Sequence, residues 1–343
     1  MSKDVSGGLP VEREYFHAEK PGPEVRDATN VWLVEENGDF AMRIGIEGLA
    51  EMWDNHELWL DIAYPDGRVL NSRDRCKSHS PIGPEGKPTI LGTGPLEFRC
   101  VEPFKLWTIK FEQYPVSDIT AQQLIEDVYP DPVPKVQVAF DIEFRPAVPP
   151  LVSGTMTEES REMMKGAEGS FLSPRFEQLC RATGWLQVDG QKREFKGQIL
   201  RIKRQGVRKF EGFWGHCWQS ALFPSGKAFG VNVYPPRDDG KPNFNEGFIY
   251  DGDGPLIPAK AVEIPWMRKF YTGGEDVPLV LETEDGRRVS ISGKTFVNTR
   301  SQGHSVLPSA YPLIQQAHAH YTWDGEQACG MIERSTFREK MEL

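Results

Sequence analysis

The chain has 343 residues, enough for two domains of ordinary size or for one large β domain. Hydrophobic residues make up 38% of it and charged residues 26%, which excludes extensive disorder, and no run approaches the roughly 18 apolar residues of a membrane-spanning helix. A net charge of −10 repels phosphate backbones, so we expect no nucleic-acid partner. The basic stretch 201–209 is interpreted as the solvated end of a strand.

The N-terminal residues Met1–Asp4 are polar and lack the apolar segment of a secretory signal. The five cysteines are scattered, and no two have the Cys-x-x-Cys spacing of structural zinc sites. We therefore expect a cytoplasmic protein with reduced thiols, no disulfide framework, no metal and no stable insertion into a membrane. The sequence leaves a homodimer open.

Along the chain, alternating apolar segments end at signals for tight turns. Segments 31–34 and 41–46 flank Asn37-Gly38, and segments 185–188 and 318–323 each precede an Asp-Gly dipeptide. Both dipeptides favour hairpins, because the two central residues of a type I′ turn need a positive φ. Together with the regular alternation at 136–144, this pattern predicts an all-β protein made of antiparallel strands.

Helical signals are few and short. The capping-box spacing from Thr155 to Glu158 predicts a helix that ends near Gly166, and 117–127 is a second candidate. We interpret 151–173 as a linker containing the first of these helices. It would separate an N-terminal β-sandwich or β-barrel domain at 1–150 from a C-terminal β-barrel domain at 174–343.

The segment from Trp214 to Ser220 has the strongest functional signal. If it is a strand, Trp214, His216 and Trp218 share one face, while Gln219 lies on the other. A histidine between two tryptophans can exchange protons in an apolar cavity. The alternative is a packed aromatic ladder with a hydrogen-bonded histidine.

Other titratable residues are weaker candidates. Glu177 lies in a mixed apolar strand, where a carboxyl group facing a dry cavity would have a raised pKa and could act as an acid. An ion pair with an arginine is the alternative, and it is favoured for Glu333. His318 and His320 share one strand face, but two imidazoles are too few for a metal site, so a metal-assisted lyase is a minor hypothesis.

The order of motifs in the second half resembles a known family. Phe176-Glu-Gln178, the Gly184–Gly190 segment, the Trp214–Trp218 strand and the terminal Gly330–Ser335 follow one another. This order resembles the two-domain lipocalin-like proteins that include the carotenoid 1,2-hydratases (hydroxyneurosporene synthase-like) and fungal Diels–Alderases, and most of all a bacterial branch of that group. The resemblance covers mainly residues 170–335. It implies two consecutive lipocalin-like β-barrel or β-sandwich units, with a largely apolar ligand site within or between them and usually no metal or redox cofactor.

One motif of these relatives is altered here. Many of them carry Arg-Asp-His-Ser-Trp-Gly-x-Arg where this chain has Arg201 to Arg208. The two arginines and Gly206 match, whereas the Asp, His, Ser and Trp do not. If those polar residues carry the relatives' chemistry, this chain has lost it or moved it to the Trp214–Trp218 strand.

The resemblance and the residues together lead to two hypotheses. The first is a cofactor-independent enzyme that hydrates, dehydrates, isomerises or cyclises a hydrophobic, terpenoid- or steroid-like small molecule. His216 would be its acid/base, helped by Glu177 or His304. The substrate would be bound by the residues Trp214, Trp218, Gln219, Arg201, Arg208 and Phe229. The second hypothesis is a non-catalytic carrier or sensor of such a ligand.

Overall fold

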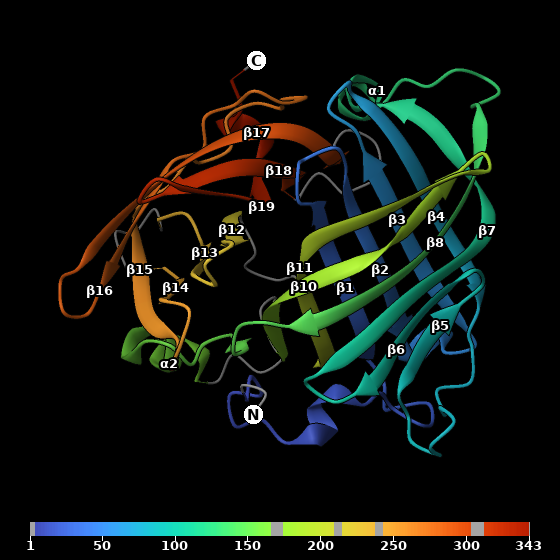
Figure 1. Ribbon diagram of the computed structural model, residues 1–343, viewed down its shortest axis with the longest axis horizontal. Coiled ribbons are helices and arrows are strands. Elements are labelled where there is room, and N and C mark those ends of the chain that lie inside the picture. The colour runs from blue at the N-terminus through green and yellow to red at the C-terminus, as the bar shows by residue number, and fades with distance from the viewer. Residues whose placement is uncertain (1–3, 166–173, 209–214, 237–242, 303–311, 343) are drawn as a thin grey trace.

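A computed structural model describes residues 4–165, 174–208, 215–236, 243–302 and 312–342. Figure 1 shows two β-barrels lying side by side, with the N-terminal half of the chain mainly in one and the C-terminal third in the other. The predicted class of two consecutive antiparallel lipocalin-like barrels with few short helices is confirmed. Neither α-helix of the described residues is long or apolar enough to cross a membrane.

Barrel 1 is a ring of eight antiparallel strands in the order β4-β3-β2-β1-β11-β10-β8-β7, closed by pairing of β7 with β4. The ring strands are β1 (Val25–Glu35), β2 (Ala41–Leu49), β3 (Asn55–Ala63), β4 (Arg68–Lys77), β7 (Leu106–Thr120), β8 (Lys135–Pro146), β10 (Arg175–Val188) and β11 (Gln191–Val207). Strands β6 (Leu96–Glu102) and β5 (Ile90–Thr93) extend the sheet from β7, and β9 (Leu151–Val152) pairs with β10.

Barrel 2 is a closed ring of eight strands in chain order. They are β12 (His216–Leu222), β13 (Ala228–Val233), β14 (Asn245–Tyr250), β15 (Ile257–Glu263), β16 (Leu279–Thr283), β17 (Arg288–Gln302), β18 (Leu313–Trp323) and β19 (Glu326–Thr336). Pairing of β19 with β12 closes the ring.

The strand pairing differs from the domain division expected from the sequence. The sequence predicts that 174–343 forms one unit, which would include β10 and β11, but these strands pair with β8 and β1 and complete barrel 1. Barrel 1 is therefore built from residues 25–207 and barrel 2 from 216–336. Apolar and polar residues alternate along a strand in the same way whether it belongs to barrel 1 or to barrel 2. The boundary between the barrels is therefore decided only by which strands pair with each other.

Two of the Asp-Gly hairpins form as expected. Asp189 and Gly190 between β10 and β11 have φ values of 46° and 81°, and Asp324 and Gly325 between β18 and β19 have 50° and 78°. Both central residues thus adopt the left-handed conformation of a type I′ turn, which lets the long strands pair without an intervening loop.

The short helices are α1 (Ala121–Glu126) and α2 (Glu158–Met164), and 3₁₀ turns occur at Val11–Glu14, Ala50–Met52 and Arg338–Lys340. The capping box of α2 begins at Thr157, two residues after the expected position. Just before this helix, Glu246 of β14 accepts hydrogen bonds of 2.8 Å from the Gly154 and Met156 backbone N–H groups. The segment that joins the barrels is therefore anchored to barrel 2.

The two barrel interiors are filled by their own side chains. Barrel 1 encloses a large aromatic and aliphatic core that includes Trp107, Phe111 and Phe140, and barrel 2 encloses a core that includes Phe229 and Tyr321. A third apolar cluster lies outside both, where Trp32, Leu179 and Leu200 of barrel 1 meet Trp218 and Leu222 of barrel 2.

Candidate functional site

Strand β12 presents its two faces to different surroundings. Cys217 and Ala221 point into the core of barrel 2, whereas Trp218 and Leu222 belong to the cluster between the barrels. His216 lies two residues before Trp218 and shares its face, because successive side chains of a strand alternate. The face predicted to carry His216 and Trp218 is thus the one turned toward barrel 1.

His216 is held between a hydroxyl and a carboxylate of the neighbouring strand β19. Its Nδ1 lies 2.6 Å from Ser335 Oγ, and its Nε2 lies 3.0 Å from Glu333 Oε1. Ser335 is the cross-strand partner of His216, and Glu333 is the partner of Trp218, so the β12–β19 register brings the three groups together. All three residues are buried.

The Glu333 carboxylate is ionised in this setting. Burial alone would raise its pKa, but the hydrogen bond and charge of His216, together with Arg43 and Gln316, hold the pKa at about 2. An ionised carboxylate only accepts hydrogen bonds, so His216 Nε2 must carry a proton and donate it to Glu333. In neutral His216, Nδ1 is then the acceptor and Ser335 Oγ–H is the donor.

A cavity of about 260 Å³ borders this chain of hydrogen bonds. Its lining is largely apolar and consists of Pro235, Pro236, Trp266, Met267, Arg268, Ser335, Thr336 and Lys340. Ser335 is the residue common to the cavity and to the His216 hydrogen bonds.

Trp218 is fixed by contacts from barrel 1. Its indole packs edge-on against Trp32, with ring centroids 4.8 Å apart, and its Nε1–H donates to Glu177 Oε2 at 2.8 Å. The other oxygen of Glu177 accepts from Arg175 Nη2 at 2.5 Å. The predicted role of Glu177 as a catalytic assistant stays a prediction, and the observed contacts orient Trp218.

Arginines surround Glu333 from both barrels. Across the sheet of barrel 2, Glu333 pairs with Gln316, which pairs with Arg300 of β17. Arg43 of β2 lies on the facing surface of barrel 1, and the Arg43 and Arg300 guanidiniums lie 4.4 and 4.2 Å from the centroid of the Trp59 ring. The interface thus combines indole rings, two buried cations and an ionised carboxylate.

The two arginines predicted to bind substrate lie apart from each other. Arg201 is fully buried inside barrel 1, where its Nη2 donates to Glu14 Oε1 at 2.8 Å and to Gln178 Oε1 at 2.7 Å. Arg208 lies at the end of β11, with its Nη1 4.0 Å from Glu47 Oε1. Arg201 therefore neutralises a buried carboxylate, whereas Arg208 extends the charged surface of barrel 1.

The remaining residues predicted for the site do not lie next to His216 either, or fall outside the described residues. Gln219 and Phe229 face the interior of barrel 2, where both contact Tyr321: its hydroxyl donates to Gln219 at 2.8 Å and its ring packs edge-on against Phe229. These two residues are separated from His216 by the β12 backbone. Trp214 and His304 lie outside the described residues.

Ser335 is not among the residues that the sequence predicts for the site, and Glu333, predicted to pair with an arginine, is hydrogen-bonded to His216. One signal was available, since both residues lie on one face of a strand that ends the chain's last hairpin. The pairing of that strand with β12, more than 100 residues earlier, was not visible in the sequence. His318 is fully buried, whereas His320 stacks on Phe296. Across the described ranges, no group of three or more His, Cys, Asp or Glu side chains is arranged to hold a metal ion.

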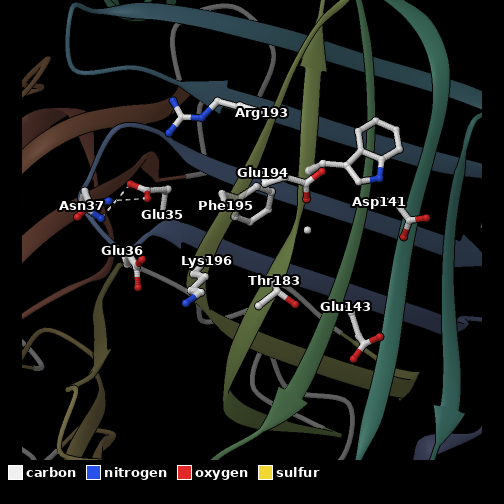
Figure 2. A pocket seen from close by; sticks show the side chains of 12 residues that line it. Glu35, Glu36, Asn37, Asp141, Glu143, Thr183, Arg193, Glu194, Phe195 and Lys196 are labelled. Carbon is white, nitrogen blue, oxygen red and sulfur yellow. Dashed lines mark hydrogen bonds between the residues drawn. The ribbon is translucent and has the colours of Figure 1, made fainter.

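A second hollow, of about 680 Å³, lies on the outer face of barrel 1 (Figure 2). Its floor is formed by polar side chains of β8, β10 and β11, among them Glu143, Thr183 and Lys196, and Glu35 and Asn37 hydrogen-bond to each other at its rim. None of the residues that line the hollow is a histidine, so it has no counterpart of the buried His216–Glu333 pair.

Comparison with solved structures finds the same two-barrel fold. An AttH-type protein from Nitrosomonas europaea superposes with a TM-score of 0.56 at 12% identity, over 92% of this chain and 93% of that chain. CghA superposes with a TM-score of 0.54 at 11% identity, over 93% and 90% of the two chains, and its complex with Sch210972 gives 0.51 at 11% identity, over 91% and 88%. Kievitone hydratase from Nectria haematococca gives 0.49 at 9% identity, over 94% and 93%.

The similarity to this group of lipocalin-like proteins, expected from the order of motifs, is confirmed by these structures. None of the curated proteins compared with the chain matches it in sequence. A family model covers residues 11–338, which is nearly the whole chain and includes both barrels. The chain therefore belongs to the family described as Domain of unknown function (DUF7064).

Proposed function

We propose that this protein is an enzyme that moves a proton to or from a hydrophobic small molecule held in the cavity beside Ser335. The observation that carries the proposal is the hydrogen-bonded series Ser335–His216–Glu333 at the edge of an apolar cavity. Hydration, dehydration and isomerisation need such a proton transfer in surroundings poor in water. CghA, which shares the fold, is solved with the small molecule Sch210972, and this also supports the proposal.

The order of proton transfer follows from the ionised Glu333. Ser335 Oγ takes a proton from the substrate while it passes its own proton to His216 Nδ1. The imidazolium that forms is stabilised by the Glu333 carboxylate, 3.0 Å from Nε2. In the reverse direction, the imidazolium returns a proton to Ser335, and Ser335 protonates an alkene or an alcohol. Ser335 is the catalytic residue in contact with substrate, and His216 acts through it.

The experiment begins with protein purified from its own host, analysed by native mass spectrometry and solvent extraction to identify a bound compound. That compound is then incubated with the protein in deuterium oxide and followed by NMR. Wild-type protein should introduce deuterium at carbon or convert the compound. His216→Ala and Ser335→Ala should slow this by roughly 10²- to 10⁴-fold, as is typical when an acid/base group is removed. Arg145→Gln on the exposed face of β8 is the matched control and should behave as wild type.

A bound compound that leaves the wild-type protein chemically unchanged and without deuterium would overturn the enzymatic proposal. That result would favour the carrier hypothesis, in which the barrels hold an apolar ligand without transforming it.

A further inference from the structure

The buried surfaces where the barrels meet carry two arginines whose N–H donors are only partly satisfied. Arg43 is 5% exposed and Arg300 is 4% exposed. Arg43 Nη2 donates to Asn30 Oδ1 at 3.3 Å, but within the described part of the chain Arg43 Nε, Arg43 Nη1 and Arg300 Nε have no hydrogen-bond acceptor. No carboxylate of the described residues lies within 4.0 Å of either guanidinium. Unsatisfied buried donors of this kind are costly unless a ligand or water accepts from them.

Both guanidiniums are gathered at one indole ring. They come from different barrels, Arg43 from β2 and Arg300 from β17, and both lie within 4.5 Å of the Trp59 ring centroid. Contact with the π face stabilises each cation and directs the planar N–H groups sideways, away from the ring. Arg73 also lies over this ring, at 5.3 Å.

The charge count at this place is positive. The acidic residues that interact electrostatically with Arg300 are Asp61 and Glu333, against the cations Arg300, Arg43 and Arg73. Arg43 also interacts with Glu47, but Glu47 is paired with Arg26 at 2.7 Å, so three arginines face two further carboxylates and leave one positive charge. Burial, together with the charges of Arg73 and Arg43, lowers the pKa of Arg300 well below its ordinary value. One further anion would balance the group and accept from its free N–H donors.

The positive group lies beside the proposed proton-transfer residues. Arg300 is two strands away from Glu333 across barrel 2, through Gln316, which corresponds to roughly 10 Å at the usual strand spacing. Gln316 also donates a hydrogen bond to Glu333. Ser335 lies two residues farther along β19, so a molecule that contacts both Ser335 and Arg300 would have to span roughly 12 Å.

We propose that Arg43 and Arg300, stacked on Trp59 at the junction of the two barrels, bind a carboxylate or similar oxyanion of the substrate. This inference rests on the proposed function, because it specifies the substrate of the same site: an apolar body with one anionic group roughly 12 Å from the position that exchanges its proton.

The test compares two fluorescent probes that have the same apolar ring system and differ in one anionic group. 8-Anilinonaphthalene-1-sulfonate carries an anionic oxygen group that stands in for the carboxylate, and N-phenyl-1-naphthylamine lacks it. Wild-type protein should bind the sulfonate at least about tenfold more tightly at constant ionic strength, as one charge-assisted contact provides. Arg43→Gln and Arg300→Gln should abolish this preference without weakening binding of the neutral probe. Arg300→Lys should retain part of it, and Arg145→Gln, an exposed arginine of β8, should retain all of it.

Equal affinities of the two probes for wild type would overturn the anion subsite and leave the proposed proton transfer intact, because that is measured by deuterium incorporation. A preference for the sulfonate that survives both glutamine variants would also overturn it. Failure of both probes to bind would contradict this inference and the apolar site of the proposed function together.

Discussion

Substitution of Glu333 by glutamine tests the electrostatics of the site most directly. The pKa of Glu333 is about 2 in the folded protein, compared with its ordinary value of 4.5. Since a difference of one in pKa corresponds to roughly 1.4 kcal/mol, the ionised carboxylate stabilises the folded state by about 3 kcal/mol at neutral pH. Glu333→Gln should lower the free energy of unfolding by about that amount.

The pH dependence of this loss has a definite sign. A carboxyl group whose pKa is lowered by folding contributes its full stabilisation above the unfolded pKa of 4.5, and the contribution disappears as pH falls toward about 2. The stability difference between wild type and Glu333→Gln should therefore be largest at neutral pH and shrink steadily below pH 4.5.

The assay is urea denaturation followed by tryptophan fluorescence, from neutral pH to about pH 3. Glu143→Gln is the control, because Glu143 forms an exposed ion pair with Arg145 and should contribute less than about 1 kcal/mol at any pH. If Glu333→Gln were as stable as wild type at neutral pH, or if the difference did not change on acidification, the assignment of Glu333 as the ionised partner of His216 would be wrong.

Three further predictions concern buried groups around the site. Glu14→Gln breaks the ion pair with Arg201 inside barrel 1 and should lower the free energy of unfolding, measured by urea denaturation, by about 3–5 kcal/mol. The affinity for 8-anilinonaphthalene-1-sulfonate should stay unchanged. Weaker binding of the dye by the folded variant would show that Arg201 belongs to the ligand site. Trp218→Phe removes the N–H donor to Glu177 and should cost about 1–3 kcal/mol, against little change for Trp185→Phe on the outer face of barrel 1. Burial lowers the pKa of His318 to about 3, so the folded protein disfavours its protonation and wild type should lose stability as pH falls from 6.5 toward 3. The stability of His318→Leu should fall less on acidification than that of wild type, and the two proteins should be equally stable at neutral pH. If His318→Leu were less stable than wild type at neutral pH, the imidazole would have a polar partner in the folded protein.

The fold class and the faces of single strands followed from local sequence. Asp189-Gly190 and Asp324-Gly325 form tight hairpins because their backbone preferences need no distant partner. The alternation of β12 correctly separated His216 and Trp218 from Gln219, since the period of two is a property of the strand itself.

The partners of those faces were decided by tertiary structure. Ser335 and Glu333 reach His216 only because β19 closes barrel 2 against β12, and Arg43 approaches Arg300 only because the two barrels pack together. The same holds for β10 and β11, whose alternation suits either barrel and whose hydrogen bonds place them in the first. Strand pairing and barrel packing join residues far apart in the chain, and local periodicity contains no information about which strand, or which barrel, will supply the opposing side chain.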